Sequence, residues 1–236
     1  IIMCGAFLNG ESFINAQTAI DKGLKSINRI SAEAIIGFLA DDELQGREAG
    51  TGAARIAARY LAANLKEAGI SPLYGDSYFQ PFEACAKERQ QKGARWQGHP
   101  DSISLLKNVT HRSLQMANVL GIIPGKKTDE YVIVGAHFDH LGVDETLAND
   151  PIYNGADDNA SGVSAVLQIA RAFKASGKKP MRNVVIAFWD GEEKGLLGSR
   201  YFVQSCDFIG KVKGYLNFDM IGRNSKPECP NHVVYF

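Results

Sequence analysis

Apolar positions along the chain follow helical spacing in the N-terminal quarter. Over residues 18–40 they recur every three or four positions, which predicts a helix. These apolar positions are Leu24, Ile27, Ile30, Ala34 and Phe38. The segment 44–51 is turn-rich, and the Ala-rich stretch after it predicts a second helix. We expect Gly69 to end this helix at the C′ position, where glycine is favoured.

From residue 117 onward the pattern changes to apolar runs that alternate with helical segments, as in α/β sheets. Strands are predicted at 117–123, 131–136, 183–189 and 213–218. The first two are predicted to be neighbours joined by the turn 124–127, and residues 232–236 resemble the start of another strand. Helices are predicted at about 160–176 and 195–204. The buried face of the first is predicted to hold Val163, Val166, Leu167, Ala170 and Phe173.

The segment 83–112 breaks this regularity, because it is polar and irregular and carries several basic residues and Trp96. We interpret it as a long surface loop that includes a hairpin, near the entrance of a functional site. The chain shows no internal repeat and no low-complexity segment.

Composition places the chain among ordinary globular domains. Its 236 residues suit one domain, with 45% hydrophobic and 22% charged residues. Lys plus Arg equals Asp plus Glu at 26 each, so we expect neither a nucleic-acid partner nor an anionic membrane surface as partner. No apolar run approaches the roughly 20 residues that a bilayer span requires.

The N-terminus and the cysteines bear on the compartment. Residues 1–17 are interpreted as a signal-peptide remnant of an exported protein, with an N-terminal arm as the alternative. The four cysteines lack C-x-x-C spacing, so we do not expect a structural zinc site. One or two disulfides stay open for an exported chain. The cysteines are Cys4, Cys85, Cys206 and Cys229.

Four short acidic segments mark the chemistry. They read A-H-F-D-H at 136–140, N-G-A-D-D-N-A-S-G at 154–162, F-W-D-G-E-E at 188–193 and N-F-D-M-I-G-R at 217–223. Most follow a predicted strand, and open α/β sheets build their sites at the carboxyl ends of strands. Carboxylates that converge there repel one another unless cations lie between them. The sequence therefore predicts a multinuclear metal site.

The order and spacing of these segments resemble the zinc peptidase family of bacterial leucyl-type aminopeptidases and glutamate carboxypeptidase, over residues 30–225. That family carries H-x-D, D-D, E-E and D-M in this order. The resemblance implies an α/β fold, a three-layer α/β/α sandwich with a mixed, mostly parallel central sheet. It also implies one catalytic domain over 18–236 that lacks the C-terminal portion of the family domain.

The resemblance implies a set of zinc ligands: His137, Asp158, Glu193 and Asp219. Asp158 would bridge two zinc ions. One ion would also be held by His137 and Asp219, and the other by Glu193 and a distal histidine that this chain does not supply. His232, the sole downstream histidine, is not expected to be that ligand. A cis Asp158–Asn159 peptide bond is implied as well. One imidazole among carboxylates suits zinc better than magnesium or calcium.

His137 and Asp139 are two residues apart at a strand end, so they share one face. Asp139 is expected to reach the second ring nitrogen of His137 and fix its orientation. His140, His99 and His111 are interpreted as ordinary histidines, and His140 would point away from Asp139 if the strand continued.

The acidic segments also have alternative interpretations. The D-D pair could be an acidic turn that caps a helix, with Asp157 as its turn residue. The E-E pair could be an exposed loop. Asp219 could be a strand-end carboxylate paired with Arg223.

The function implied by the resemblance is that of a two-zinc aminopeptidase acting on peptides with a free N-terminus. A zinc-bridging hydroxide would attack the scissile carbonyl, and Glu192, free of metal, would act as general base. Glutaminyl cyclase, with one zinc, is the alternative within the family, and a carboxypeptidase for acidic C-termini is another. A non-catalytic binding protein with a degenerate metal site is the alternative from another class.

Overall fold

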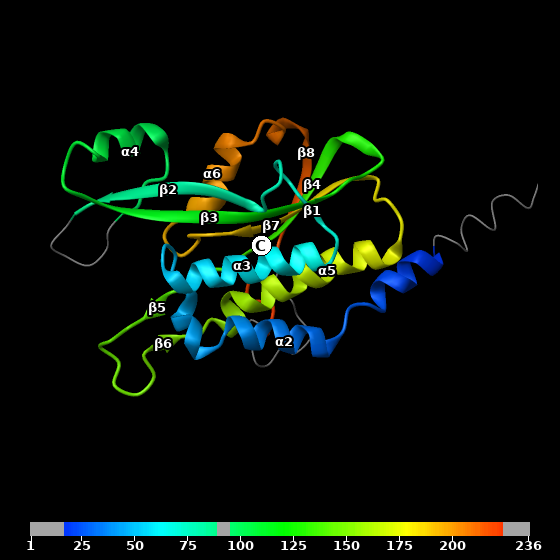
Figure 1. Ribbon diagram of the computed structural model, residues 1–236, viewed down its shortest axis with the longest axis horizontal. Helices are drawn as coiled ribbons and strands as arrows, with labels where there is room; N and C mark the ends of the chain where they lie inside the picture. The colour runs from blue at the N-terminus through cyan, green and yellow to red at the C-terminus, as the bar shows by residue number, and fades with distance from the viewer. Residues whose placement is uncertain (1–16, 89–94, 224–236) are drawn as a thin grey trace, which may run out of the picture.

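A six-stranded mixed sheet forms the centre of the molecule, in the order β1-β3-β7-β4-β8 with β2 also paired to β3 (Figure 1). The structure is a computed structural model that describes residues 17–88 and 95–223. The strands of this sheet are β1 (Ser71–Pro72), β2 (Phe79–Lys87), β3 (His111–Ile123), β4 (Lys127–His137), β7 (Arg182–Trp189) and β8 (Val212–Asn217). A separate two-stranded ribbon consists of β5 (Gly142–Val143) and β6 (Ile152–Tyr153).

Helices lie on both faces of the sheet. Residues 17–24 are helical, and the labelled helices are α2 (Arg29–Leu39), α3 (Gly52–Glu67), α4 (Pro100–Leu106), α5 (Gly162–Ser176) and α6 (Leu197–Ser205). Three short irregular turns are η1 (Asp42–Arg47), η2 (Ala156–Ser161) and η3 (Ile209–Lys211). In Figure 1, α2, α3 and α5 lie on one side of the sheet and α6 on the other.

Strand β7 shows how the sequence builds these layers, because successive side chains of a strand point to opposite faces. Ile186 and Phe188 join the apolar core that α2, α3 and α5 cover. Val185 and Trp189 join a smaller core on the α6 side, where Phe202 packs against them. The three-layer α/β/α sandwich is thus confirmed. The sheet is mixed as predicted. It is not mostly parallel, because among its described strands three pairs are antiparallel and two are parallel.

The prediction that the strands at 117–123 and 131–136 are neighbours is wrong, because β7 lies between β3 and β4. The connection 124–127 instead crosses the start of β7. Gly125 N–H donates to Asn183 Oδ1 at 2.9 Å, and Asn183 Nδ2 donates to the Thr128 carbonyl at 3.0 Å. A Cβ at Gly125 would lie 2.2 Å from the Arg182 carbonyl carbon, so only glycine allows this close approach.

The interpretation of 83–112 as a long loop with a hairpin is correct only for the hairpin, because both ends of the segment lie in paired strands. Strands β2 and β3 pair antiparallel from Phe79 opposite Val119 to Lys87 opposite His111. Helix α4 lies between them, with Pro100 in its first turn. Phe82 and the consecutive residues 84–86 of β2 are buried, so this end of the segment is part of the sheet and not of a surface loop.

The N-terminal helix predicted over 18–40 is interrupted. Residues 25–28 are non-helical, and Asn28 caps α2 because its side chain accepts from Ser31 N at 2.9 Å. The buried residues of α2 are Ile35 and Leu39, whereas most of the predicted apolar positions are exposed. The second helix matches its prediction, since α3 is followed by Gly69 with φ of +68°.

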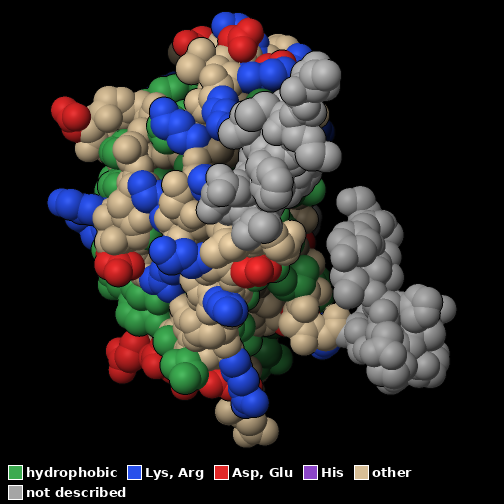
Figure 2. Space-filling model, turned by 90° about the vertical axis from the view of Figure 1, so that its right-hand side faces the viewer, with side chains coloured by type: hydrophobic (Ala, Val, Ile, Leu, Met, Phe, Trp, Pro, Cys, Tyr) green, Lys and Arg blue, Asp and Glu red, His purple; other side chains and the backbone are tan. Residues whose placement is uncertain are grey.

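None of the helices within residues 17–88 and 95–223 combines the length and the apolar character of a bilayer span. Cys85 and Cys206 are both buried and unpaired, while Cys4 and Cys229 lie outside the described residues. Residues 1–16, interpreted as a signal-peptide remnant or an arm, and residues 232–236, predicted to start a strand, also lie outside them. On the face in Figure 2, basic and acidic side chains are interspersed, in agreement with the balanced formal charge.

Candidate metal centre

The carboxyl ends of three parallel strands meet at one edge of the sheet. In the parallel pairs of β4 with β7 and β8, His137 lies opposite Trp189 and Gly135 lies opposite Asn217. The predicted acidic segments continue directly from these strand ends, while the D-D-N segment forms η2 at the start of α5. The fold therefore brings all four segments together, as the sequence predicts.

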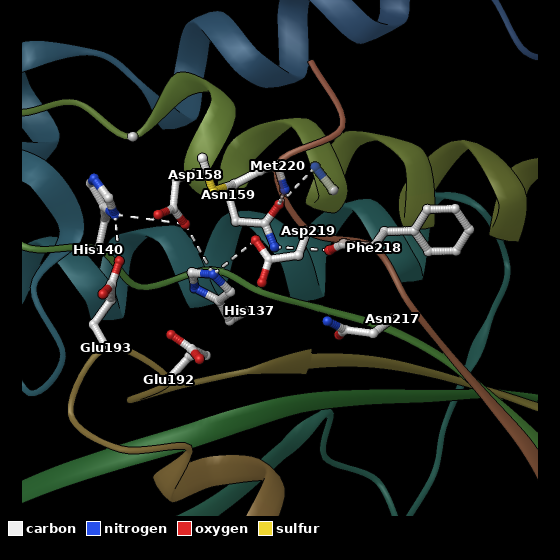
Figure 3. Close-up of polar contacts among 12 residues, drawn as sticks. His137, His140, Asp158, Asn159, Glu192, Glu193, Asn217, Phe218, Asp219 and Met220 are labelled. Atoms are coloured by element: carbon white, nitrogen blue, oxygen red, sulfur yellow. Dashed lines mark hydrogen bonds and ion pairs between the residues drawn. The ribbon is translucent and has the colours of Figure 1, made fainter. Parts of the chain in front are cut away.

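A first group of donors consists of His137, Asp158 and Asp219 (Figure 3). His137 Nε2 lies 3.1 Å from Asp158 Oδ1 and 3.5 Å from Asp219 Oδ1. Around a tetrahedral zinc ion with bonds of about 2.0–2.1 Å, neighbouring donors lie about 3.3 Å apart. Both distances from His137 Nε2 are close to this spacing.

Asp139 fixes the orientation of His137, although partly through its backbone. His137 Nδ1 lies 3.1 Å from the Asp139 carbonyl oxygen and 3.6 Å from Oδ1 of the same residue. A proton on Nδ1 leaves the lone pair of Nε2 directed at the two carboxylates. The Asp139 carboxylate, which was expected to reach the ring, chiefly accepts from the backbone N–H groups of Glu192 and Glu193, at 3.0 and 3.3 Å. It therefore also fixes the E-E turn.

Asn159 ties the D-D-N segment to the D-M segment. Its Nδ2 donates to the Phe218 carbonyl at 2.9 Å, and its Oδ1 accepts from Gly162 N at 3.0 Å. The Asp158–Asn159 peptide bond is cis, which confirms the prediction. The helix-cap alternative is wrong, because neither η2 nor α5 has a side-chain hydrogen bond at its N-cap. Asp157 instead contacts the end of the D-M segment, where its Oδ1 accepts from Gly222 N at 2.7 Å and its Oδ2 pairs with Arg223 at 2.8 Å.

A second group of donors consists of His140, Asp158 and Glu193. His140 Nδ1 lies 2.8 Å from Glu193 Oε1 and 4.0 Å from Asp158 Oδ1. The expected direction, away from Asp139, applied only if the strand continued, and β4 ends at His137. His140 instead lies beside Glu193, and its interpretation as an ordinary histidine stays a prediction.

Arg47 anchors the loops of this centre. Sequence reasoning missed this role, because the only signal at the position is a Gly-Arg turn. Its guanidinium is fully buried and donates to the carbonyls of Phe138 at 2.8 Å, Asn154 at 2.6 Å and Gly155 at 3.0 Å, and also to that of Leu39. Burial lowers the pKa of Arg47 to about 10, against the opposing effect of nearby carboxylates. The side chain thus joins the H-x-D-H and N-G-A-D-D segments.

The negative charges of the carboxylates in this centre favour a bound cation. Burial alone would lower the pKa of His137, but the carboxylates of Asp139, Asp158 and Asp219 outweigh it and raise the value to about 12. The hydrogen bond from His137 lowers the pKa of Asp158. An imidazolium here neutralises part of the negative charge that a divalent cation would otherwise balance. Two imidazoles among carboxylates fit zinc as donor set.

Glu192 belongs to neither donor group, although it lies beside His137 (Figure 3). Burial raises the pKa of its carboxyl group, and His137 opposes this while Asp139, Glu193 and Asp219 add to it. A carboxylate with a raised pKa, next to a metal position and not occupied by it, is suited to accept a proton. The two adjacent glutamates thus differ in their surroundings, and their predicted roles as base and ligand stay predictions.

Asp190, just before the E-E pair, carries a testable pH dependence. Burial, followed by the charge of Asp139, raises its pKa from 3.8 to about 7. A raised carboxyl pKa means that ionisation costs more in the folded state, so this carboxylate lowers stability increasingly between about pH 4 and pH 7. The Asp190→Asn variant has no ionisable group at this position, so its stability does not fall in this way as the pH rises. Its advantage in free energy of unfolding over wild type should grow across that range by at most about 1.4 kcal/mol per pH unit.

Urea unfolding of wild type and Asp190→Asn at a series of pH values measures this difference. A constant offset between the two proteins from pH 4 to pH 8 would contradict a raised Asp190 pKa. The absolute offset can take either sign, because Oδ2 accepts from Ala117 N at 3.1 Å while Oδ1 is buried without a partner among the described residues.

Comparison with known proteins gives relatives for the part of the chain that carries this centre. Residues 118–232 match the family model described as Peptidase family M28. Leupeptin-inactivating enzyme 1 of Streptomyces exfoliatus is 34% identical over 120 residues, which cover 50% of this chain and 24% of that protein. An aminopeptidase of Pseudomonas aeruginosa is 34% identical over 133 residues, covering 55% and 23%. Over this segment the chain matches peptidase family M28, which confirms the resemblance.

Solved structures agree on the fold. The aminopeptidase from Aneurinibacillus sp. strain AM-1 superposes with a TM-score of 0.57 at 17% identity, over 89% of this chain and 73% of that one. Glutaminyl cyclase from Porphyromonas gingivalis superposes with a TM-score of 0.54 at 22% identity, over 84% and 61%. The chain spans about a quarter of the length of the curated relatives reported above.

Proposed function

We propose that this chain is the metal-binding part of a zinc aminopeptidase. The observation that carries the proposal is the pair of donor groups that share Asp158, with Glu192 left outside both. A shared carboxylate can bind one metal with each oxygen, as in two-metal hydrolases. His137 and Asp219 would complete one position, and Glu193 would contribute to the other.

When bound, zinc would supply Lewis acidity towards the scissile carbonyl and would make the attacking water more acidic. The chain's own residues do the rest. Glu192 accepts a proton from the attacking water and delivers it to the leaving amine. Asp139 holds Glu192 in place through the backbone N–H bond at 3.0 Å and keeps the His137 ring oriented.

Room for a substrate exists beside this centre. A hollow of about 410 Å³ is lined by Glu48, Trp96, Arg112, Glu193, Lys194 and Gly195. It borders the second donor group, and the β2–β3 hairpin region supplies Trp96 and Arg112, which agrees with the predicted position near a site entrance. Carboxylates around the centre would attract the positively charged α-amino group of a peptide. The substrate class is therefore proposed to be peptides with a free N-terminus.

Glutaminyl cyclase activity is the second candidate, because a protein of that name shares the fold. The cyclase implied by the resemblance works with one zinc ion, so the second donor group, His140 with Asp158 and Glu193, favours the peptidase. Retention of Glu192 speaks against a binding protein without activity, since pure binding needs no base.

Hydrolysis of aminoacyl p-nitroanilides by the purified chain, and by a form extended beyond Phe236, tests the proposal. We expect release of nitroaniline from free-amine substrates and none from N-acetylated ones. A zinc chelator should abolish the activity, and added zinc should restore it. Cyclisation of glutaminyl peptides without hydrolysis would replace the peptidase with the cyclase. No reaction of either kind in zinc-loaded protein would overturn both.

A further inference from the structure

Arg112 is an exposed cation on the wall of the hollow of about 410 Å³ that Glu193 also borders. Its guanidinium carbon lies 5.5 Å from the centroid of the Trp96 ring, and within residues 17–88 and 95–223 it has no acidic partner. We propose that Arg112 is a specificity residue that binds a carboxylate of the peptide substrate. This inference rests on the proposed function and names its substrate class as acidic peptides, with the carboxylate in a side chain or at the C-terminus of a short peptide.

Strand β3 directs Arg112 towards the metal centre, because alternate residues of a strand share one face. Arg112, Leu114 and Met116 therefore lie on the same face of β3. A Cβ at Gly50 would lie 2.6 Å from Leu114 Cδ2, and a Cβ at Gly191 would lie 2.9 Å from Met116 Sδ. This face thus packs on the two turns that carry these glycines, one of which leads into the E-E pair. Arg112 continues the same row of side chains into the hollow.

Trp96 is a fixed platform for the guanidinium. The next residue, Gln97, pairs with Cys85 of β2 through two backbone hydrogen bonds, at 2.9 and 2.8 Å. The half-buried ring packs against the small apolar cluster that contains Phe82 and Met116. A guanidinium that lies over an aromatic ring keeps its edge N–H groups available, and these match the two oxygens of a carboxylate. The stacked position therefore presents donors to the hollow.

The other charges of the hollow already have partners. Lys194 Nζ pairs with Glu48 Oε1 at 2.7 Å, so these two side chains neutralise each other. Glu193 Oε1 is 2.8 Å from His140 Nδ1, and in the proposed enzyme this carboxylate faces a zinc ion. Arg112 is thus the one charge among the lining residues that the described part of the chain leaves unbalanced. A substrate carboxylate would gain a charge-assisted hydrogen bond here, whereas a cationic side chain would be repelled.

The alternative role for Arg112 is structural, in which it would only cover Trp96 and stabilise the hairpin. Both residues lie before the segment 118–232 that the family model matches, so the family likeness does not decide between the roles. A structural role would affect all substrates alike. Recognition of a carboxylate would affect only the substrates that carry one, and this difference can be measured.

Three pairs of dipeptides, each differing in one carboxylate, test the inference and locate the group. Leucyl-glutamine against its amide tests a C-terminal carboxylate. Leucyl-glutamic acid α-amide against leucyl-glutamine amide tests the side chain after the scissile bond, and aspartyl-alanine amide against asparaginyl-alanine amide tests the N-terminal side chain. In at least one pair we expect kcat/KM to be about 10-fold or more higher for the acid, as for a hydrogen bond to a charged group. Equal values within all three pairs overturn the inference.

Substitution of Arg112 should remove this preference. In Arg112→Gln the ratio of kcat/KM within the selective pair should fall to about one, and Arg112→Lys should lie between, because lysine keeps the charge but not the planar fork. The ratio compares two substrates on the same protein, so a general loss of activity cancels. The matched control is Arg55→Gln, at an exposed arginine of α3, which should keep the wild-type ratio. An unchanged ratio in Arg112→Gln overturns the inference in favour of the structural role.

Binding measurements keep this test separate from the proposed function, because they need no turnover. Calorimetry on zinc-loaded protein gives dissociation constants for the same dipeptides with a CH₂–NH group in place of the scissile amide. If the protein has no peptidase activity but wild type binds an acid form about 10-fold more tightly than Arg112→Gln does, only the proposed function is overturned. Peptidase activity without any effect of Arg112 on the acid forms overturns this inference alone.

Discussion

Replacement of Glu192 by glutamine is expected to lower kcat by about 10²- to 10⁴-fold while the bound zinc is retained, because the variant loses only the proton acceptor. Glutamine has the size of glutamate and keeps the backbone N–H that donates to Asp139 at 3.0 Å. Glu192 lies outside both donor groups, so the metal positions keep all their ligands. Peptidase assays combined with elemental analysis for zinc measure the two quantities separately.

The matched control for this prediction is Glu33→Gln. Glu33 lies on the exposed face of α2, where it pairs only with the exposed Arg29 at 2.6 Å. The same chemical change there should leave kcat and zinc content at wild-type values. If Glu192→Gln loses its zinc, the glutamate is a ligand and not a base. If it keeps both zinc and wild-type kcat, some other group must carry the proton.

The positions of the acidic segments were predictable because a simple rule of α/β sheets applies to them. Apolar runs identify β4, β7 and β8, and the carboxyl ends of parallel strands meet at one edge. Which strands are neighbours was not predictable in the same way. The short connection 124–127 suggested a hairpin, yet it crosses the start of β7 through Gly125 and Asn183. That contact joins residues far apart in sequence, and local patterns do not encode it.

His140 escaped prediction for a different reason. Periodicity assigns a face only while the strand lasts, and β4 ends at His137. The direction of His140 depends on Arg47, Tyr153 and Gly155, which come from two other segments of the chain. The one available signal was the second histidine of H-x-D-H, three residues after a predicted ligand. In a single sequence, a histidine that faces a site cannot be told apart from an ordinary one.

Arg47 is the residue whose loss should cost the most stability. Replacement of Arg47 by methionine is expected to lower the free energy of unfolding by about 3–5 kcal/mol, as is typical when one member of a buried charged network is removed. The guanidinium donates hydrogen bonds to four backbone carbonyls, those of Leu39, Phe138, Asn154 and Gly155. Methionine fills similar space but donates no hydrogen bond, so these buried acceptors would lose a partner.

Urea unfolding of metal-free protein checks this value, with Arg55→Met as the matched control. Arg55 is exposed on α3, and its one described hydrogen bond reaches the Gly50 carbonyl at 3.3 Å, so the same substitution there should change stability by less than about 0.5 kcal/mol. A loss below about 1 kcal/mol at Arg47 would mean that water replaces the guanidinium. Zinc affinity should also fall in Arg47→Met, because Arg47 joins the loop of His137 to the loop of Asp158. A variant that loses stability but keeps its zinc affinity would show that these loops hold the ligands without it.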